Sequence, residues 1–457
     1  MKKRILSLLL AAVMAASLLV GCGNKSDEQK DPASDGGQQS SASQTGNETP
    51  KGDPVVINLA LSQGEHTDDL VNFLPKFEEE NNVKVNVDII TESGYIQKVM
   101  LGLSAEKQEY DVFMASNGMW GQLLDSGWAH PLEEFIADDS LTSQEWRDGF
   151  ADSMLDVVTR DGHRYAVVYQ MGTNILYYNK AIFAANGLDP DSPPKTLAEV
   201  LEVAEKLNHP EDGQYGIVFR ASREQTINTF FWLMLWFSQG GNWYDVPGCP
   251  DIAVLDQPAA IQATQYYADF HKYAPQGIAN YGFEDAMLAM QQGKAAMWID
   301  TSILAGNLLN PENSLISEDV GFSAFEEGRA IGAPWTFMMA KNTEHPEESW
   351  KLMEYLTGFE VTWEQTKSGK QTSPVRTDVL EHPEIDQYMN AELGAALAKS
   401  LETACPLYWP VISQTAEIRN IMSVNISDAA AGKKTAEEAM LETNAETIKI
   451  LQRDGLM

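Results

Sequence analysis

Aromatic side chains stand next to amides and carboxylates at several points where a predicted strand or loop ends. The chain contains 11 tryptophans, and several of them lie beside polar residues rather than within apolar runs. Aromatic rings pack on flat apolar surfaces, while amides and carboxylates form hydrogen bonds with hydroxyl groups. Such pairs suit a ligand that has both an apolar face and a rim of hydroxyl groups. The candidate ligand-binding residues are Gln63, Glu65, Asn117, Trp120, Tyr169, Gln170, Trp243, Asp300, Trp335, Arg376 and Trp409.

Each candidate also has a purely structural interpretation. Gln63 and Glu65 follow the first predicted strand, where solvated loop residues are common. Trp120 lies where a helix would begin and would then pack inward, and Trp335 would fill a surface between two parts of the fold. Arg376 would form a buried salt bridge. The sequence leaves the functional and the structural interpretation open at these positions.

Sequence motifs for catalysis or metal binding are absent. The chain has no Gly-x-Ser-x-Gly, His-Glu-x-x-His, Walker, Cys-x-x-Cys or EF-hand pattern, and its seven histidines lack ligand spacing. We therefore expect no catalytic residues, no cofactor and no metal ion, and a binding protein rather than an enzyme. A pair of catalytic carboxylates among the 66 acidic residues would give the alternative function, a secreted, lipid-anchored glycan hydrolase.

The part of the chain after residue 54 begins with an α/β unit. Residues 55–61 predict a buried strand, residues 67–81 a helix, and residues 83–90 a second strand. Strand, helix and strand form the unit of a parallel sheet. After a helix over residues 95–105, residues 110–115 predict a third strand that leads to Asn117 and Trp120. Because ligands gather at the carboxyl ends of such strands, this loop is a candidate ligand wall.

Later segments alternate long helices with a few strands. An extended run over residues 165–180 would cross from one lobe to another, and further strands are predicted over residues 295–299 and 333–340. The apolar run 230–235 is expected in the core, so Trp243 is preferred to Trp236 as a ligand contact. The predicted helices span residues 197–207, 226–239, 258–273, 283–292, 346–356 and 435–452.

Size and charge limit the class of protein. About 400 residues follow the first 54, which is more than one hydrophobic core usually holds, so we expect two lobes. The formal net charge of −34 would repel nucleic acid and anionic lipid but permits a neutral ligand. We expect a monomer with no nucleic-acid partner. Besides Cys22, only Cys249 and Cys405 are present, either as two free thiols or as a disulfide that nothing local requires.

The first 22 residues have the pattern of an export signal. Lys2, Lys3 and Arg4 precede an apolar stretch that ends in Leu19-Val20-Gly21-Cys22. A membrane-spanning helix needs about 20 apolar residues, and this stretch is shorter. This pattern resembles a bacterial lipobox, which implies removal of residues 1–21, diacylation of Cys22 and a lipid anchor on the extracellular face of the cell membrane. Residues 22–54 predict a disordered polar linker. The alternative is a plain secretory peptide with an incidental cysteine.

Short motifs recur in a fixed order along residues 55–457. They are Tyr110-Asp111-Val112, Leu123-Leu124-Asp125-Ser126-Gly127-Trp128 with Pro131-Leu132, Leu176-Tyr177-Tyr178-Asn179-Lys180, Gly293-Lys294-Ala295-Ala296-Met297, Ser373-Pro374-Val375-Arg376, and Ala431-Gly432-Lys433-Lys434 before Glu437-Glu438-Ala439. Each motif is weak alone. Together they resemble the family 1 extracellular solute-binding proteins, the carbohydrate receptors of ABC importers that include the maltose-binding protein.

The resemblance implies an α/β fold with two lobes, a hinge that the chain crosses more than once, and a ligand cleft between the lobes. Lobe one would hold residues 55–168 and 337–372, and lobe two residues 169–336 and 373–457. The implied partners are a mono- or oligosaccharide and the permease subunits of an ABC transporter, with the membrane reached only through the lipid anchor. In the family, ligand contacts follow the strand that ends before Asp300.

One loop departs from the family pattern. Gly332-Ala333-Pro334-Trp335 stands where many members carry a Gly-Gly pair before the aromatic residue. Because proline fixes φ and has no backbone N–H, Pro334 would aim Trp335 differently. The departure affects the choice of ligand rather than the fold.

Overall fold

The computed structural model describes residues 52–244 and 251–457, so the predicted signal peptide, the lipid site Cys22, most of the predicted linker and Cys249 lie outside the described residues. A mixed sheet of seven strands organises the described chain. Its strands lie in the order β2 (Val83–Ile90), β1 (Val55–Ser62), β3 (Val112–Ser116), β9 (Gly332–Met339), β6 (Val167–Asn179) and β7 (Met297–Thr301), with β8 (Val320–Ser323) beside β6.

The first three strands pair in parallel, as predicted. β1 pairs with β2 from Val55 opposite Val83 to Ser62 opposite Ile90, and with β3 at Leu59 opposite Val112. Valine, isoleucine and leucine supply most of the apolar residues of β1 and β2, and the β-branched ones fit a buried pleated surface. Parallel strands need crossover connections, which helices α2 (Leu74–Asn81) and α3 (Glu92–Ser104) supply.

The single helix predicted over residues 67–81 is wrong. The segment forms α1 (Glu65–Asp68), a 3-10 turn (Asp69–Asn72) and then α2, whose first turn contains Pro75. Proline has no N–H to bond the carbonyl four residues earlier, so a continuous helix would lose a hydrogen bond at Pro75, whereas the first turn of a helix tolerates it. The helix therefore restarts at Leu74.

Strand β6 crosses the described structure along its whole length. All 13 of its residues are buried. Its first half pairs with β9 from Val167 to Thr173, and its second half pairs with β7 and β8 from Asn174 to Asn179. A β-bulge between Val168 and Gln170 shifts the register at the start of the crossing. The predicted extended run is thus confirmed.

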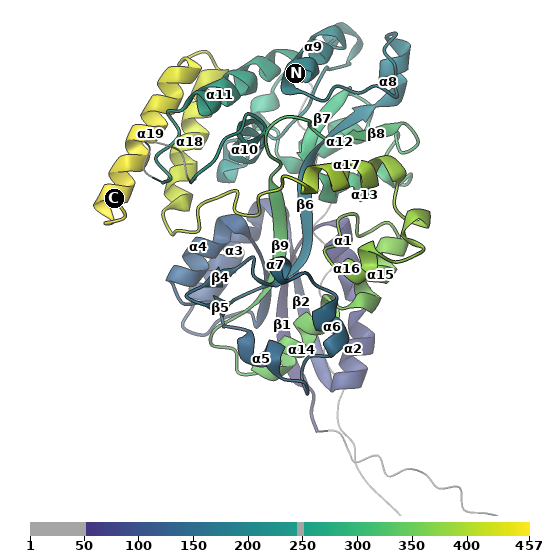
Figure 1. Cartoon of the computed structure of the whole chain (residues 1–457), viewed down its shortest axis with the longest axis vertical. Coiled ribbons are helices and arrows are strands. Elements are labelled where there is room, and N and C mark those ends of the chain that lie inside the picture. The colour runs from purple at the N-terminus through teal and green to yellow at the C-terminus, as the bar shows by residue number, and fades with distance from the viewer. Residues whose placement is uncertain (1–51, 245–250) are drawn as a thin grey trace, which may run out of the picture. The chain divides into compact units, whose positions relative to one another are not determined.

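Buried hydrophobic residues form two clusters. The first core draws on residues 57–171 and 337–375, and the second core on residues 175–333 and 393–451. Figure 1 shows β6 and β9 running between the two groups of elements. Around the first core lie α4 (Asn117–Asp125), α5 (Glu133–Ala137), α6 (Gln144–Asp148), α7 (Asp152–Leu155), the hairpin β4 (Thr159–Arg160) and β5 (His163–Arg164), α14 (Pro346–Leu356), α15 (Phe359–Lys367) and α16 (Thr377–Leu380).

Helices dominate the second core. They are α8 (Lys180–Ala185), α9 (Leu197–Lys206), α10 (Asn228–Ser238), α11 (Pro258–Phe270), α12 (Phe283–Gln291), α13 (Ala305–Leu309), α17 (Ala391–Leu401), α18 (Thr415–Ala430) and α19 (Ala436–Arg453). The six predicted helices are confirmed with shifts of a few residues at their ends. α9 and α19 begin with complete capping boxes, Thr196 with Glu199 and Thr435 with Glu438, which satisfy the first N–H groups of each helix.

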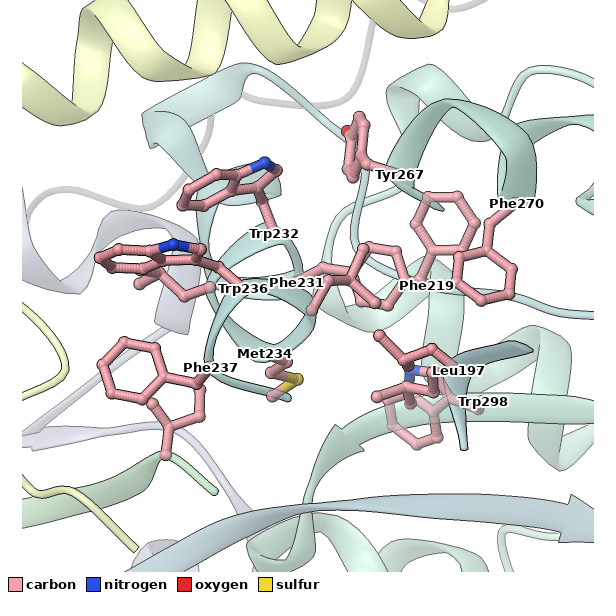
Figure 2. Packing of buried hydrophobic residues seen from close by; sticks show 14 of the residues in the cluster. Leu197, Phe219, Phe231, Trp232, Met234, Trp236, Phe237, Tyr267, Phe270 and Trp298 are labelled. Atoms are coloured by element: carbon pink, nitrogen blue, oxygen red, sulfur yellow. The ribbon is translucent and has the colours of Figure 1, made fainter. Parts of the chain in front are cut away.

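Helix α10 is apolar all round and therefore lies inside the second core. Figure 2 shows its aromatic residues spreading in different directions from one helix. The Phe231 ring stacks on Phe219 with centroids 4.3 Å apart, while Trp232 stacks on Trp236 at 5.4 Å. Trp232 also donates a hydrogen bond to Thr264 at 2.8 Å. The helix thus anchors the packing of this core.

None of the helices in the two described ranges combines the length and the apolarity that a membrane span requires.

Removing one aromatic ring from this cluster should destabilise the protein strongly. Phe231→Ala leaves a cavity beside Phe219, Tyr267 and Phe270, and we expect a loss of about 3–5 kcal/mol in the free energy of unfolding. Urea denaturation followed by circular dichroism measures it. Leu288→Ala, at a side chain that is half exposed, is the control and should change stability by no more than about 0.5 kcal/mol. A loss below about 1 kcal/mol for Phe231→Ala would contradict this packing.

Candidate ligand-binding cavity

A cavity of about 100 Å³ lies between the two cores. It opens at the carboxyl ends of β3 and β7, where Ser116 and Thr301 line it, as expected for ligand sites in α/β sheets. Its other lining residues are Ile96, Gly118, Arg220, Ile227, Phe230, Ile303, Ala333, Pro334, Trp335, Tyr408, Trp409 and Arg419. The volume is below the about 300–1,000 Å³ of typical ligand pockets, so a sugar would enter only with the lobes further apart.

A larger hollow of about 360 Å³ lies beside α13, α15 and α17. Its described lining includes one aromatic ring, Tyr388, and no charged side chain. The cavity between the cores has four aromatic residues and two arginines. Chemistry rather than size therefore makes the smaller cavity the candidate site.

Aromatic walls enter the cavity from both cores. Trp335, on β9, is partly exposed. Its ring and the buried Tyr95 ring form a T-shaped pair with centroids 5.8 Å apart. Trp409, on the opposite side, is buried and packs against Trp243, with the ring centroids 5.5 Å apart. Two flat apolar surfaces that belong to different cores thus face one space.

A buried ion pair lies at one wall of the cavity, where Arg220 is a lining residue. The Arg220 guanidinium donates two hydrogen bonds of 2.8 Å to the carboxylate of Asp300, and both side chains are almost fully buried. Asp300 also accepts a hydrogen bond from the backbone N–H of Thr301 at 2.7 Å. Its oxygens are therefore already bonded within the protein, and Asp300 itself does not line the cavity.

A second guanidinium reaches the cavity from α18. The Cζ atom of Arg419 lies 5.2 Å from the centroid of the Trp409 ring. Burial lowers the pKa of this arginine. A Cβ atom placed on Gly118 would lie 2.8 Å from its Nη1 atom, so glycine leaves the space that the guanidinium fills.

Helix α4 holds the two cores together beside the cavity. The Oδ1 atom of Asn117 accepts a hydrogen bond from the backbone of Trp409 at 2.5 Å. Arg160, which lies on β4 and pairs with Asp125 at the end of α4, donates to the carbonyl of Val411 at 2.8 Å. A Cβ atom on Gly121 would lie 2.3 Å from the carbonyl oxygen of Ile412. Only glycine at this position permits such a close approach of the two backbones.

Of the residues singled out from the sequence, Trp335 and Trp409 line the cavity. Asn117 and Trp243 lie behind it, because Asn117 bonds the backbone of Trp409 and the Trp243 indole donates to the carbonyl of Tyr408 at 2.8 Å. Trp120 is fully buried in α4 and packs into the first core.

The other predicted site residues lie elsewhere. The Tyr169 hydroxyl donates to Gln365 at 2.6 Å inside the first core, and Gln170 is buried at the bulge of β6. Arg376 is buried in the first core, paired with Asp378 and bonded to the carbonyl of Thr357. Gln63 is exposed after β1 and does not line the cavity, and Glu65 begins α1.

Arg220 and Arg419 were not singled out from the sequence. Arg220 directly follows the apolar run Ile217-Val218-Phe219, just as several other candidates follow a predicted strand. This position in the sequence could have identified Arg220 as a candidate. Arg419 lies within a helical segment, where a charged residue usually marks a solvated face. Nothing local distinguishes it.

The described residues offer little for catalysis. No carboxylate is among the described residues that line the cavity, whereas glycoside hydrolysis needs a pair of them. No group of three or more histidine, cysteine, aspartate or glutamate side chains is placed for a metal ion in the described ranges. Cys405 is a free thiol, and burial raises its pKa.

Two α/β cores with strands passing between them and a cavity enclosed at the crossing define a solute-binding protein. Residues 63–362 match the family model for bacterial extracellular solute-binding proteins, and the chain belongs to this family. The predicted family and the predicted two-lobed α/β fold are confirmed.

Some similar proteins match most of this chain, and others match about half of it. The probable amino-acid ABC transporter periplasmic-binding protein y4oP of Sinorhizobium fredii is 24% identical over 415 residues, 88% of this chain and 90% of that protein. The mannitol-binding protein of Pseudomonas aeruginosa is 27% identical over 265 residues, 57% of this chain and 56% of that protein. The crystal structure of a Thermotoga lettingae solute-binding protein with bound alpha-D-tagatose has a TM-score of 0.77 at 24% identity, covering 87% of this chain and 100% of that one.

Breaking the buried ion pair should destabilise the second core. Asp300→Asn removes the charge that balances Arg220, and we expect a loss of about 3–5 kcal/mol in the free energy of unfolding, because a buried cation is left without its partner. Chemical denaturation measures it. Glu402→Gln, in the exposed pair with Lys399, is the control and should leave stability unchanged. Native stability in Asp300→Asn would contradict a structural role for the pair.

Proposed function

We propose that this protein binds a carbohydrate between its two lobes and delivers it to an ABC transporter permease without changing it chemically. The observation that carries the proposal is that Trp335 and Trp409 enter one cavity from opposite cores. A ring held by both tryptophans would favour the arrangement in which the lobes are close together. A transporter can recognise that arrangement.

Names of relatives support a polyhydroxylated ligand. One curated relative is named a mannitol-binding protein, and the similar Thermotoga structure holds alpha-D-tagatose. Another relative is named for amino-acid transport. The aromatic surfaces favour the carbohydrate, since they match the apolar faces of a sugar ring. The hydrolase alternative lacks support, because no carboxylate is among the described residues that line the cavity.

We assign direct ligand contact to Trp335 and Trp409. Asn117 and Trp243 act by positioning Trp409, through the backbone and through ring packing. The proposed lobes keep the predicted boundaries, residues 55–168 and 337–372 against 169–336 and 373–457. The separation of buried residues into two clusters supports this division.

We also propose that the mature protein is a monomer anchored through a lipid on Cys22, on the extracellular side of the membrane. The lipobox-like sequence and the polar segment behind it support the anchor. Membership in an extracellular family agrees with export.

A sugar panel tests the proposed function. Thermal shift of the processed protein against mannitol, tagatose, maltose and a wider set of mono- and oligosaccharides should find a stabilising ligand, because a ligand at 100 times its Kd adds about 2.7 kcal/mol. Chromatography should recover that ligand unchanged, and small-angle scattering should show a more compact protein. Hydrolysed product in proportion to the protein would instead support the glycan hydrolase.

Trp335→Ala should then weaken binding of the identified ligand by about 2 kcal/mol or more, because the stacking surface is lost. Calorimetric titration measures the affinity and circular dichroism the fold. Trp128→Ala, at a partly exposed tryptophan outside the cavity, is the matched control and should bind normally. Native affinity in a folded Trp335→Ala would remove this residue from the site.

Cys22→Ala should release the protein from the membrane fraction or leave its signal peptide uncleaved, because the acylated thiol is gone. Fractionation with mass spectrometry of the N-terminus measures both results. Cys405→Ala is the control and should remain membrane-bound. A Cys22→Ala protein that stays anchored and correctly cleaved would contradict the lipid site.

A further inference from the structure

The described residues that line the cavity between the cores carry an unbalanced positive charge. Two guanidinium groups line it, those of Arg220 and Arg419. The charge of Arg220 is balanced by Asp300, which it binds through two parallel hydrogen bonds. Arg419 has no ion pair with any acidic residue in the described ranges, and its buried Nε atom has no hydrogen-bond partner there.

Nearby carboxylates are committed to other partners. Glu417, two positions from Arg419 on α18, pairs with Arg453 at 2.9 Å. Asp125, at the end of α4, pairs with Arg160 and accepts a hydrogen bond from the backbone of Ser413. Among the residues that the structure describes, these acids therefore leave Arg419 without a counter-charge.

Two further features add positive potential. The N-terminus of α4 reaches the cavity through Ser116 and Gly118, and the first N–H groups of a helix favour an anion. The guanidinium of Arg419 makes a cation–π contact with the Trp409 ring, and this contact offsets part of the cost of burying the cation. The ring offers the guanidinium no hydrogen-bond acceptor. If the lobes closed on a neutral ligand, Arg419 would lose its water without gaining a negatively charged partner. Burying a cation in this way is unfavourable.

From these contacts, and resting on the proposed carbohydrate function, we infer that the ligand is an acidic saccharide whose carboxylate pairs with Arg419 while its ring packs between Trp335 and Trp409. One free guanidinium matches a monoanionic uronate better than a dianionic phosphate ester, because Arg220 is already neutralised. The acidic surface does not prevent this pairing, since salt screens its field over about 8 Å at physiological ionic strength. The inferred ligand thus differs from the neutral polyol and ketose of the relatives.

Matched sugars test the charge. Calorimetric titration of the processed full-length protein compares galacturonate with galactose, glucuronate with glucose and glucose 6-phosphate, and digalacturonate with its methyl ester, which keeps the shape and removes the charge. We expect at least one uronate to bind on the order of 10- to 100-fold more tightly than its neutral counterpart and than the phosphate ester.

Variants test the residue. Arg419→Met should abolish the preference for the acid while leaving weak binding of the neutral form, and Arg419→Lys should restore part of the preference. Gly118→Ala keeps the charge but crowds Nη1, so it should reduce the preference with the fold intact. Arg329→Met, which removes an exposed arginine that does not line the cavity, is the control and should leave the preference unchanged.

The possible results separate the two proposals. Neutral sugars or the phosphate ester binding as tightly as the uronates would overturn the acidic ligand and leave the carbohydrate receptor standing. An unchanged preference in both Arg419→Met and Gly118→Ala would remove Arg419 from the inference. Binding of no saccharide, acidic or neutral, would overturn the proposed function itself.

Discussion

The backbone of β6 is the constraint on which the rest of the structure depends. Because the whole strand is buried, its N–H and C=O groups need partners within the protein. β6 pairs first with β9 and then with β7 and β8, while the N–H of Met171 donates to the carbonyl of Ser373, so one strand belongs to both cores. β9 crosses at the same place, and its residues Ala333 to Trp335 line the cavity there. The cavity exists where it does because two strands pass from one core to the other.

The crossing also arranges the charges of the cavity. Asp300 lies opposite Ile175 in the pairing of β7 with β6, which places its carboxylate inside the second core near Arg220. The pair is neutral as a whole, and its Arg220 side chain lines the cavity. Arg419 is different, because it rests on Trp409 with no acidic partner in the described ranges. One arginine thus shapes the cavity, and the other leaves it charged.

Strands and long helices were predictable because their signals are local. The valine-rich runs of β1 and β2 and the apolar run of α10 specify their own burial. The break before α2 was missed because helical periodicity outweighed the proline in its first turn. Trp335 was singled out because it heads a predicted strand, and Trp409 because it adjoins a second aromatic residue, Tyr408. Asp300 was expected to face a ligand, but its partner lies 80 residues earlier in the chain, a distance that no local pattern records. Arg419 was missed for the same reason, since its surroundings come from α4 and Trp409.

The close contact at Gly121 determines how far the lobes can approach. With no side chain at this position, the backbone of α4 rests directly on the segment around Ile412. Any larger residue would act as a spacer and hold the lobes apart on the side of the cavity. A receptor with such a spacer would populate its closed form less often, and its apparent affinity would fall by that fraction even with every ligand contact preserved. A substitution at this one glycine would therefore change the ligand concentration that half fills the protein without altering any residue that lines the cavity.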